Sequence, residues 1–302
     1  MKKKQGAIAV FLGATSFGIL STFVKLAYEE GFSLAEVTGI QAAFGAMILW
    51  LLWLMLKRKV STKDNQEITQ PKTATWKVIA SGACTGLVSI LYYKSVQLVP
   101  ASIAIVLLMQ YIWIGQLLEL FIFKTKPTFQ QILLIICILG GTVLATGLLE
   151  DPIESFSLEG MIYGILAATA YALFIILSGR IGNDYHSLHK SALMITGALL
   201  LIIIVLQPIS LLQFQTLQQI SIYGIILAVF GTVIPPLLFA YGMPKTGYSL
   251  GAVLSAVELP VAVSMSYFVL NESVSWLKWA GVVFILICII WKNSAKKDLA
   301  NS

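Results

Sequence analysis

The sequence predicts an all-α integral membrane protein whose ten transmembrane helices form two inverted five-helix repeats, with both chain ends in the cytosol. Three observations predict this: the composition, ten apolar runs, and the distribution of Lys and Arg. Of 302 residues, 58% are hydrophobic and 11% are charged, and the mean hydropathy is +0.88. Soluble domains are far more polar. Ten spans of about 20 residues would leave only short loops and no room for a soluble catalytic domain.

The ten helices are the apolar runs between charged, Pro-containing or Gly-rich breaks. In the first half we expect them near residues 6–27, 35–56, 77–97, 101–123 and 128–149. In the second half we expect them near residues 158–179, 191–209, 221–241, 249–270 and 274–291. The connection 57–76 is polar and contains Pro71, which predicts an exposed loop.

Orientation follows from the positive charges, because loops rich in Lys and Arg stay on the cytosolic side. Seventeen of the 20 Lys and Arg fall on the side of the N-terminus. The exceptions are Lys25, Lys94 and Lys278. The connection 150–159 has four acidic and no basic residues. Both chain ends are therefore predicted to be cytosolic, and this placement explains the net charge of +6 without a nucleic-acid partner.

Five helices per half require the second half to enter the membrane in the opposite orientation, which is the inverted-repeat plan of many transporters. We divide the chain into 1–150 and 151–302. An ungapped alignment of residues 6–26 with 160–180 gives five identities, including the pairs Leu12 with Leu166 and Thr15 with Thr169. Later helices align no better than chance, so the repeat depends mainly on topology.

Three segments carry a family resemblance: Phe23 to Glu36, Leu91 to Val106, and Ser255 to Ala280, which includes Val257-Glu258-Leu259-Pro260 and Leu270-Asn271-Glu272. They resemble the EamA-type members of the drug/metabolite transporter superfamily. The resemblance covers nearly the whole chain. It implies a ten-helix transporter of small organic solutes, commonly an exporter of amino acids, metabolites or drugs.

Glu258 is the sharpest site candidate, since an ionisable group halfway along a transmembrane helix is costly to insert. It could bind substrate and exchange protons that drive transport. The alternative is a neutral carboxyl that only stabilises packing. Pro260, Pro235 and Pro236 remove backbone donors within their helices and are either hinges at the site or passive kinks.

The remaining candidates could line one central cavity. The repeat alignment places Gln110 opposite Glu258 at similar depth. Aromatic rings with polar edges suit an organic solute, and hydroxyl groups could supply hydrogen bonds; each of these residues could instead serve ordinary packing. This set comprises Tyr93, Tyr241, Tyr171, Trp113, Thr15 and Ser16.

We therefore expect a secondary transporter that moves a small organic solute across the cytoplasmic membrane of a bacterium by alternating access, in the export direction and with proton coupling as an option. The sequence contains no Gly-x-x-x-x-Gly-Lys-Ser/Thr loop for nucleotide binding. We expect no catalytic residues, cofactor or metal; His186 and His189 have no adjacent Cys and only Asp184 nearby. The alternatives are a non-transporting sensor or scaffold, or a membrane-embedded enzyme.

The expected partners are the small-molecule substrate and the lipid bilayer. Gly82-x-x-x-Gly86 and Gly160-x-x-x-Gly164 allow helices to approach closely. Such contacts could lie within one chain or in a dimer. With so many helices to pack, we favour the first arrangement and a monomer, with a homodimer as the alternative.

Overall fold

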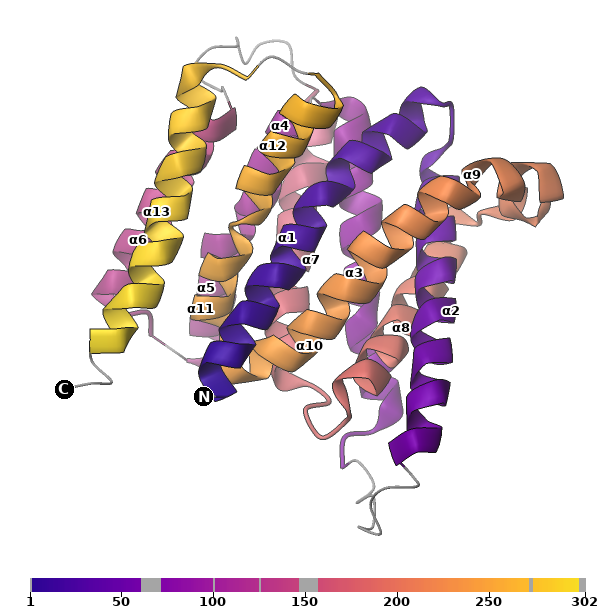
Figure 1. Cartoon of the computed structure of the whole chain (residues 1–302), viewed down its shortest axis with the longest axis horizontal. Coiled ribbons are helices and arrows are strands. Elements are labelled where there is room, and N and C mark those ends of the chain that lie inside the picture. Colours follow the sequence, from indigo (N-terminus) through magenta and orange to yellow (C-terminus); the bar gives the residue numbers. More distant parts are fainter. Residues whose placement is uncertain are drawn as a thin grey trace.

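A computed structural model describes residues 2–60, 72–99, 101–124, 126–146, 157–271 and 274–298. These residues form a helical bundle without strands (Figure 1), which confirms the all-α prediction. The predicted division at residues 150 and 151, and the acidic residues Glu150, Asp151, Glu154 and Glu272, lie outside the described residues.

The first half contains six helical segments. They are α1 (Lys2–Glu29), α2 (Leu34–Val60), α3 (Thr75–Leu98), α4 (Ala101–Met109), α5 (Tyr111–Phe123) and α6 (Phe129–Thr146). The sequence predicts one helix over 101–123, whereas the structure interrupts it at Gln110, between α4 and α5. Apolar composition continues through this break, so hydropathy alone cannot locate it.

The second half is also helical and is more irregular. It contains α7 (Leu158–Arg180), α8 (Ser187–Leu206), the 3-10 turn η2 (Ile209–Leu212), α9 (Phe214–Leu227), the π-helical turn η3 (Ala228–Val233), α10 (Ile234–Thr246), α11 (Tyr248–Ser255), α12 (Glu258–Val269) and α13 (Trp276–Asp298). The helix predicted over 221–241 extends over 214–246. The helix predicted over 249–270 breaks at Ala256 and Val257, directly before Glu258.

Seven of the described helices are long and apolar enough to cross a membrane. They are Lys3–Glu29, Leu34–Lys57, Ile103–Ile122, Leu158–Arg180, Ser187–Leu206, Phe214–Thr246 and Tyr248–Val269. Phe129–Ala145 and Trp276–Cys288 are shorter apolar helices. The chain is thus a multi-pass membrane protein, as predicted.

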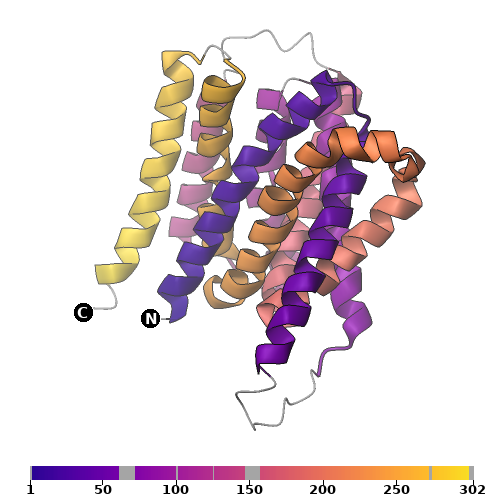
Figure 2. The same cartoon turned by 45° about the vertical axis from the view of Figure 1, so that its right-hand side comes forward.

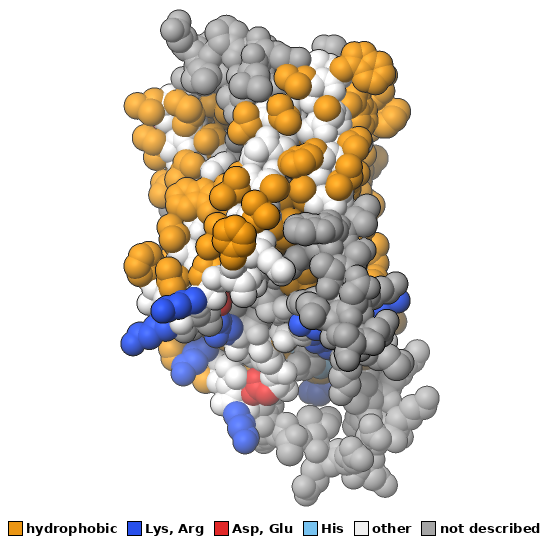
Figure 3. Space-filling model, turned by 90° about the vertical axis from the view of Figure 1, so that its left-hand side faces the viewer, with side chains coloured by type: hydrophobic (Ala, Val, Ile, Leu, Met, Phe, Trp, Pro, Cys, Tyr) orange, Lys and Arg blue, Asp and Glu red, His pale blue; other side chains and the backbone are white. Residues whose placement is uncertain are grey.

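The two ends of the bundle differ in charge. The start of α1 and the end of α13 lie at the same end (Figures 1 and 2). Lys and Arg side chains gather at this end on the face shown in Figure 3, and hydrophobic side chains predominate over the described surface above them. We call this the basic end and the other the opposite end.

Helices from the two halves interleave. Helix α3 packs against α7 and α8, α1 packs against α10 and α12, and α6 pairs with α13. Gly82 and Gly197 allow the closest approach: a Cβ on Gly82 would overlap the Met194 carbonyl, and one on Gly197 would overlap the Ile79 carbonyl. The predicted small-residue contact at Gly82 therefore lies within the chain, between α3 and α8.

Candidate functional site

A cavity lies between the two halves of the chain. It has about 750 Å³ of empty space, counting the part that is open to solvent. Its lining comprises Phe17, Leu20 and Ser21 of α1; Thr38, Gln41 and Ala42 of α2; Thr85, Val88, Ser89, Tyr92 and Tyr93 of α3; Ile105 and Leu108 of α4; Tyr171 and Phe174 of α7; Ile195, Ala198 and Ile202 of α8; Gly231 and Thr232 of η3; and Glu258 of α12.

The cavity occupies the middle of the bundle and extends toward the opposite end. Gln41 lies in the first turns of α2, which begins at the opposite end, and Ile202 lies in the last turns of α8, which ends there. None of the lining residues comes from the turns of these helices nearest the basic end.

Glu258 supplies the cavity's carboxyl group. It is 2% exposed and accepts a hydrogen bond from the Tyr171 hydroxyl. The break before α12 makes Glu258 the first residue of that helix. The positive end of the helix dipole favours negative charge at such a position. Pro260 lies in the same first turn, where its missing N–H breaks no intrahelical bond.

Aromatic rings form the wall beside this carboxyl. The Phe17 and Tyr171 rings meet edge to face with their centroids 5.9 Å apart, and the Tyr171 and Phe174 rings stack with the same centroid distance. Two rings outside the lining pack against these: the centroid of Tyr111 lies 4.7 Å from that of Tyr171, and the centroid of Phe239 lies 5.8 Å from that of Phe17. The rings are packed against one another, which fixes the shape of this wall.

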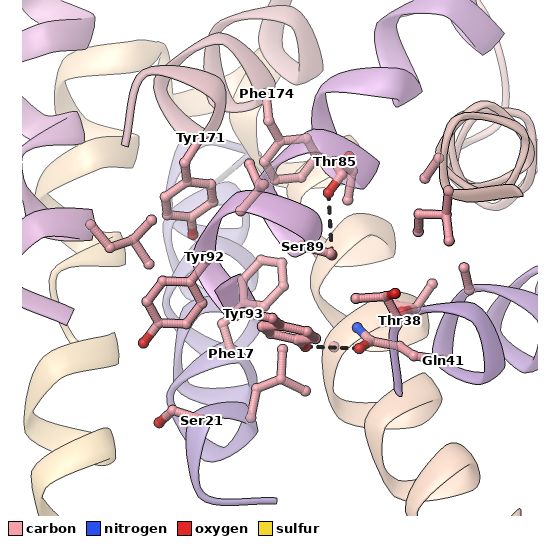
Figure 4. Close-up of a pocket in the computed structure, with 18 of the residues that line it drawn as sticks. Phe17, Ser21, Thr38, Gln41, Thr85, Ser89, Tyr92, Tyr93, Tyr171 and Phe174 are labelled. Carbon is pink, nitrogen blue, oxygen red and sulfur yellow. Dashed lines mark hydrogen bonds between the residues drawn. The ribbon is translucent and has the colours of Figure 1, made fainter. Parts of the chain in front are cut away.

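Gln41 marks the other side of the cavity. Its Oε1 accepts a 2.8 Å hydrogen bond from the Tyr93 hydroxyl. Figure 4 shows Gln41 on the opposite side of the pocket from Tyr171 and Tyr92, with the Tyr93 ring between them. The π-helical turn η3 borders the same region: a Cβ on Gly231 would lie 2.7 Å from the Gln41 Nε2. Pro235 and Pro236 follow this turn in the first turn of α10. π-Helical turns within α-helices often occur at functional sites.

Two lining hydroxyls have no hydrogen-bond partner among the described residues. They are the Tyr92 Oη and the Thr85 Oγ1, on side chains that are 6% and 9% exposed. Buried polar groups are normally paired, so an unpaired hydroxyl at a cavity needs an explanation. A polar group of a bound solute would provide one.

Contacts between the halves close the basic end. Arg180 of α7 forms a bidentate ion pair with Glu119 of α5, with both carboxylate oxygens 2.9 Å from Nη2. The Trp53 ring of α2 stacks on the His189 ring of α8 at 4.5 Å. The groups that could bind substrate and those that close this end are therefore separate.

A hydrogen-bonded clip joins the start of α3 to the turn between α7 and α8. Asp184 accepts bonds of 2.7 Å from the backbone N–H and from the hydroxyl of Thr73. Burial acts to raise the pKa of Asp184, but these hydrogen bonds outweigh it and hold the pKa below its usual value. The Tyr185 hydroxyl donates to the Thr73 carbonyl at 2.9 Å.

The structure places three of the predicted site residues, Glu258, Tyr93 and Tyr171, on the cavity lining. The others lie elsewhere. Gln110 accepts a bond from the Trp113 indole, which is 39% exposed. Tyr241 is 37% exposed and contacts Gln5. The hydroxyls of Thr15 and Ser16 donate to the carbonyls of Phe11 and Phe230, respectively.

The lining residues that sequence reasoning missed are neutral. Gln41 is a polar residue inside an apolar run, and that signal could have found it. Phe17, Phe174, Tyr92 and Thr85 give no such signal, because their role depends on which side of the helix faces the cavity. Among the described residues, no group of three His, Cys, Asp or Glu side chains could hold a metal ion.

One family model matches the chain, and relatives named as transporters are similar to it over almost their whole length. The model of the EamA-like transporter family matches residues 4–147 and again residues 158–293. The uncharacterized transporter YcbK of Bacillus subtilis is 22% identical over 297 aligned residues, covering 93% of this chain and 91% of YcbK. The uncharacterized transporter sll1319 of Synechocystis is 23% identical, covering 97% and 94%. A solved structure titled "Crystal structure of protein" shares the fold, with a TM-score of 0.67, 14% identity, and coverage of 95% and 96%.

Proposed function

Because the chain belongs to the EamA-like transporter family, and is thus a membrane transporter, we propose that it exports a small organic solute across the cytoplasmic membrane by alternating access. The basic end faces the cytosol, and proton exchange at Glu258 drives transport. The observation that carries the proposal is the cavity between the halves, with one buried carboxyl in its lining.

The packing supports ten spans in two inverted repeats. If α4–α5, α9–α10 and α11–α12 each count as one span, the described helices form five spans per half. In an inverted repeat, α1 is then equivalent to α7, α3 to α9–α10, and α4–α5 to α11–α12. The contact between α1 and α10 therefore has its counterpart between α7 and α3, and both contacts occur. The contact between α1 and α12 likewise has its counterpart in the contacts of α7 with α4 and α5, which also occur. Each half also has its break in the fourth span, and the family model matches each half separately.

This symmetry suggests how the site could face each side in turn. In the structure, the halves are tied together at the basic end by Glu119 and Arg180, while the cavity extends toward the opposite end. In an inverted repeat, exchanging the conformations of the two halves yields the state that opens the other way. The cavity would then open at the basic end after the contacts there separate.

Transport by the purified chain in liposomes tests the proposal. A panel of amines, amino acids and neutral metabolites would be offered with and without a pH gradient. We expect gradient-driven flux of at least one class, and at least a tenfold loss of that flux in Glu258→Gln, which keeps the shape but cannot exchange a proton. Glu159→Gln, the same change at an exposed carboxyl in the first turn of α7, is the matched control and should transport normally.

Two results would contradict this proposal. Unchanged pH dependence in Glu258→Gln would remove the role of that carboxyl in coupling. Absence of flux across the whole panel, with folded protein in the liposomes, would instead favour a sensor or scaffold.

A further inference from the structure

The charges around the cavity restrict the solutes that it can hold. Among the described residues, its lining includes one carboxyl, Glu258, and no Lys, Arg or His. Lys25 and Lys94, near the opposite end, are not among the lining residues. In a site with little water, an ion needs an opposite charge nearby. An anion would meet only the carboxyl, whereas a cation would find its counter-ion.

The side of the cavity near Glu258 suits an N–H donor. The Tyr171 hydroxyl already donates to the Glu258 Oε1. The Tyr92 hydroxyl, on the same side of the pocket in Figure 4, has no partner among the described residues. An ammonium group has three donors and no acceptor, so it could bond to both the carboxylate and this phenol oxygen.

The far side of the cavity has the reverse preference. Because the Gln41 Oε1 accepts from Tyr93, its Nε2 is the amide group left to serve a ligand, and it can only donate. The Thr85 hydroxyl, also unpartnered among the described residues, offers another donor. This side therefore suits a hydrogen-bond acceptor such as a carbonyl oxygen.

Apolar surface separates these two sides. The rings of Phe17 and Phe174 line the cavity together with aliphatic side chains of α4 and α8. Aromatic faces bind flat apolar groups and also attract cations through their ring electrons. A solute that reaches from one side to the other needs an apolar, preferably aromatic, body.

We propose that the substrates are amphipathic organic amines, with the ammonium group at Glu258 and Tyr92, an aromatic body against Phe17 and Phe174, and a hydrogen-bond acceptor at Gln41. This inference rests on the proposed function, because it assigns the chemistry of the same cavity. It excludes organic anions as substrates of this site.

Four probes that share an indole ring separate these requirements. They are L-tryptophanamide, which has an amine and a carbonyl; tryptamine, which has the amine alone; indole-3-ethanol, which is neutral; and indole-3-propionate, which is an anion. Binding to the purified full chain is measured by calorimetry in a weakly acidic buffer, where the amines are protonated. We expect tryptophanamide to bind most tightly, tryptamine at least about tenfold more tightly than indole-3-ethanol, and the anion most weakly.

Two variants assign the two sides. Glu258→Gln should abolish the preference for tryptamine over indole-3-ethanol. Gln41→Leu should remove the advantage of tryptophanamide over tryptamine. The proposal would be overturned if indole-3-propionate bound to the wild-type chain as tightly as tryptamine or more tightly, and this test needs no variant to fold. It would also be overturned if Gln41→Leu reduced the affinities for tryptamine and tryptophanamide equally.

The binding and transport experiments distinguish a failure of this assignment from a failure of the proposed function. Selective amine binding without flux in liposomes would contradict the proposed function and support this assignment of the cavity. Proton-driven flux of other solutes, with no indole amine bound, would contradict this assignment alone.

Discussion

Gly18 controls how closely α1 approaches the turn that carries Glu258. A Cβ at this position would lie 2.6 Å from the Glu258 carbonyl oxygen and 2.6 Å from the Val261 Cβ. Since neither atom is at the end of a flexible side chain, we expect Gly18→Ala to displace the first turn of α12 and to destabilise the protein by about 1–3 kcal/mol. Thermal unfolding of the purified chain and tryptamine binding measure the two effects.

The matched control is Gly140→Ala in α6, where a Cβ would have no atom within 4 Å. Alanine favours a helix more than glycine does, so this change should leave stability equal or slightly higher. If both substitutions had the same effect on tryptamine binding, Gly18 would have no special role in placing Glu258.

At the scale of single residues, the sequence is informative only where a side chain conflicts with its surroundings. Glu258 could be predicted because a carboxyl inside an apolar run is costly. Gln110 satisfied the same kind of argument, yet the structure pairs it with Trp113 outside the cavity lining. Tyr92 and Phe17 conflict with nothing in a membrane helix. Their place in the lining depends on the rotation of α3 and α1, which packing determines.

At the scale of helices, the pair formed by Glu119 and Arg180 links α5 to α7 at the basic end. We expect Glu119→Gln to increase the population of molecules that are open at that end, by up to about fivefold for a partly exposed ion pair. The measurement uses a chain without its native cysteines that carries Ser89→Cys in the cavity lining. An impermeant thiol reagent is added on the basic side, and the rate at which it labels this cysteine is recorded.

Exchanging the charges provides the control for this prediction. The double variant Glu119→Arg with Arg180→Glu can form the ion pair again and should label more slowly than the single variant. Glu159→Gln, at the opposite end, should label like the parent. Faster labelling in the double variant than in Glu119→Gln would mean that the attraction between these two charges does not close the basic end.

Helix positions followed from the apolar runs, whereas helix interruptions followed only where a proline lies nearby. The prolines at 235 and 236 predict an irregularity, and the structure places the π-helical turn η3 directly before them. The break at Ala256 and Val257 lies just before Pro260, which has no N–H to form the helical bond to the Ala256 carbonyl. The break at Gln110 contains no proline, and an apolar pattern does not predict it.

For the whole molecule, composition was enough to predict the class and fold type, because a bilayer requires long apolar helices. The internal repeat was harder to detect, since residues 6–26 and 160–180 share only five identities. A repeat is preserved by the pattern of packing, and many apolar residues satisfy the same contact. This explains why the exchange of helix contacts supports the symmetry better than the residues themselves do.

The proposed inverted arrangement predicts that equivalent positions in the two halves face opposite sides of the membrane. Lys77 and Gln215 are exposed residues in the first turns of α3 and α9, which begin the third span of each half at the basic and the opposite end, respectively. In cysteine-free protein, Lys77→Cys should react with an impermeant thiol reagent only from the cytosol, because positively charged ends are retained there. Gln215→Cys should react only from outside.

Labelling of both positions from the same side would exclude an inverted repeat, and reversed labelling of both would preserve the repeat but place the basic end outside. Since alternating access by exchange of the two halves requires opposite orientations, this measurement tests the symmetry on which the mechanism depends.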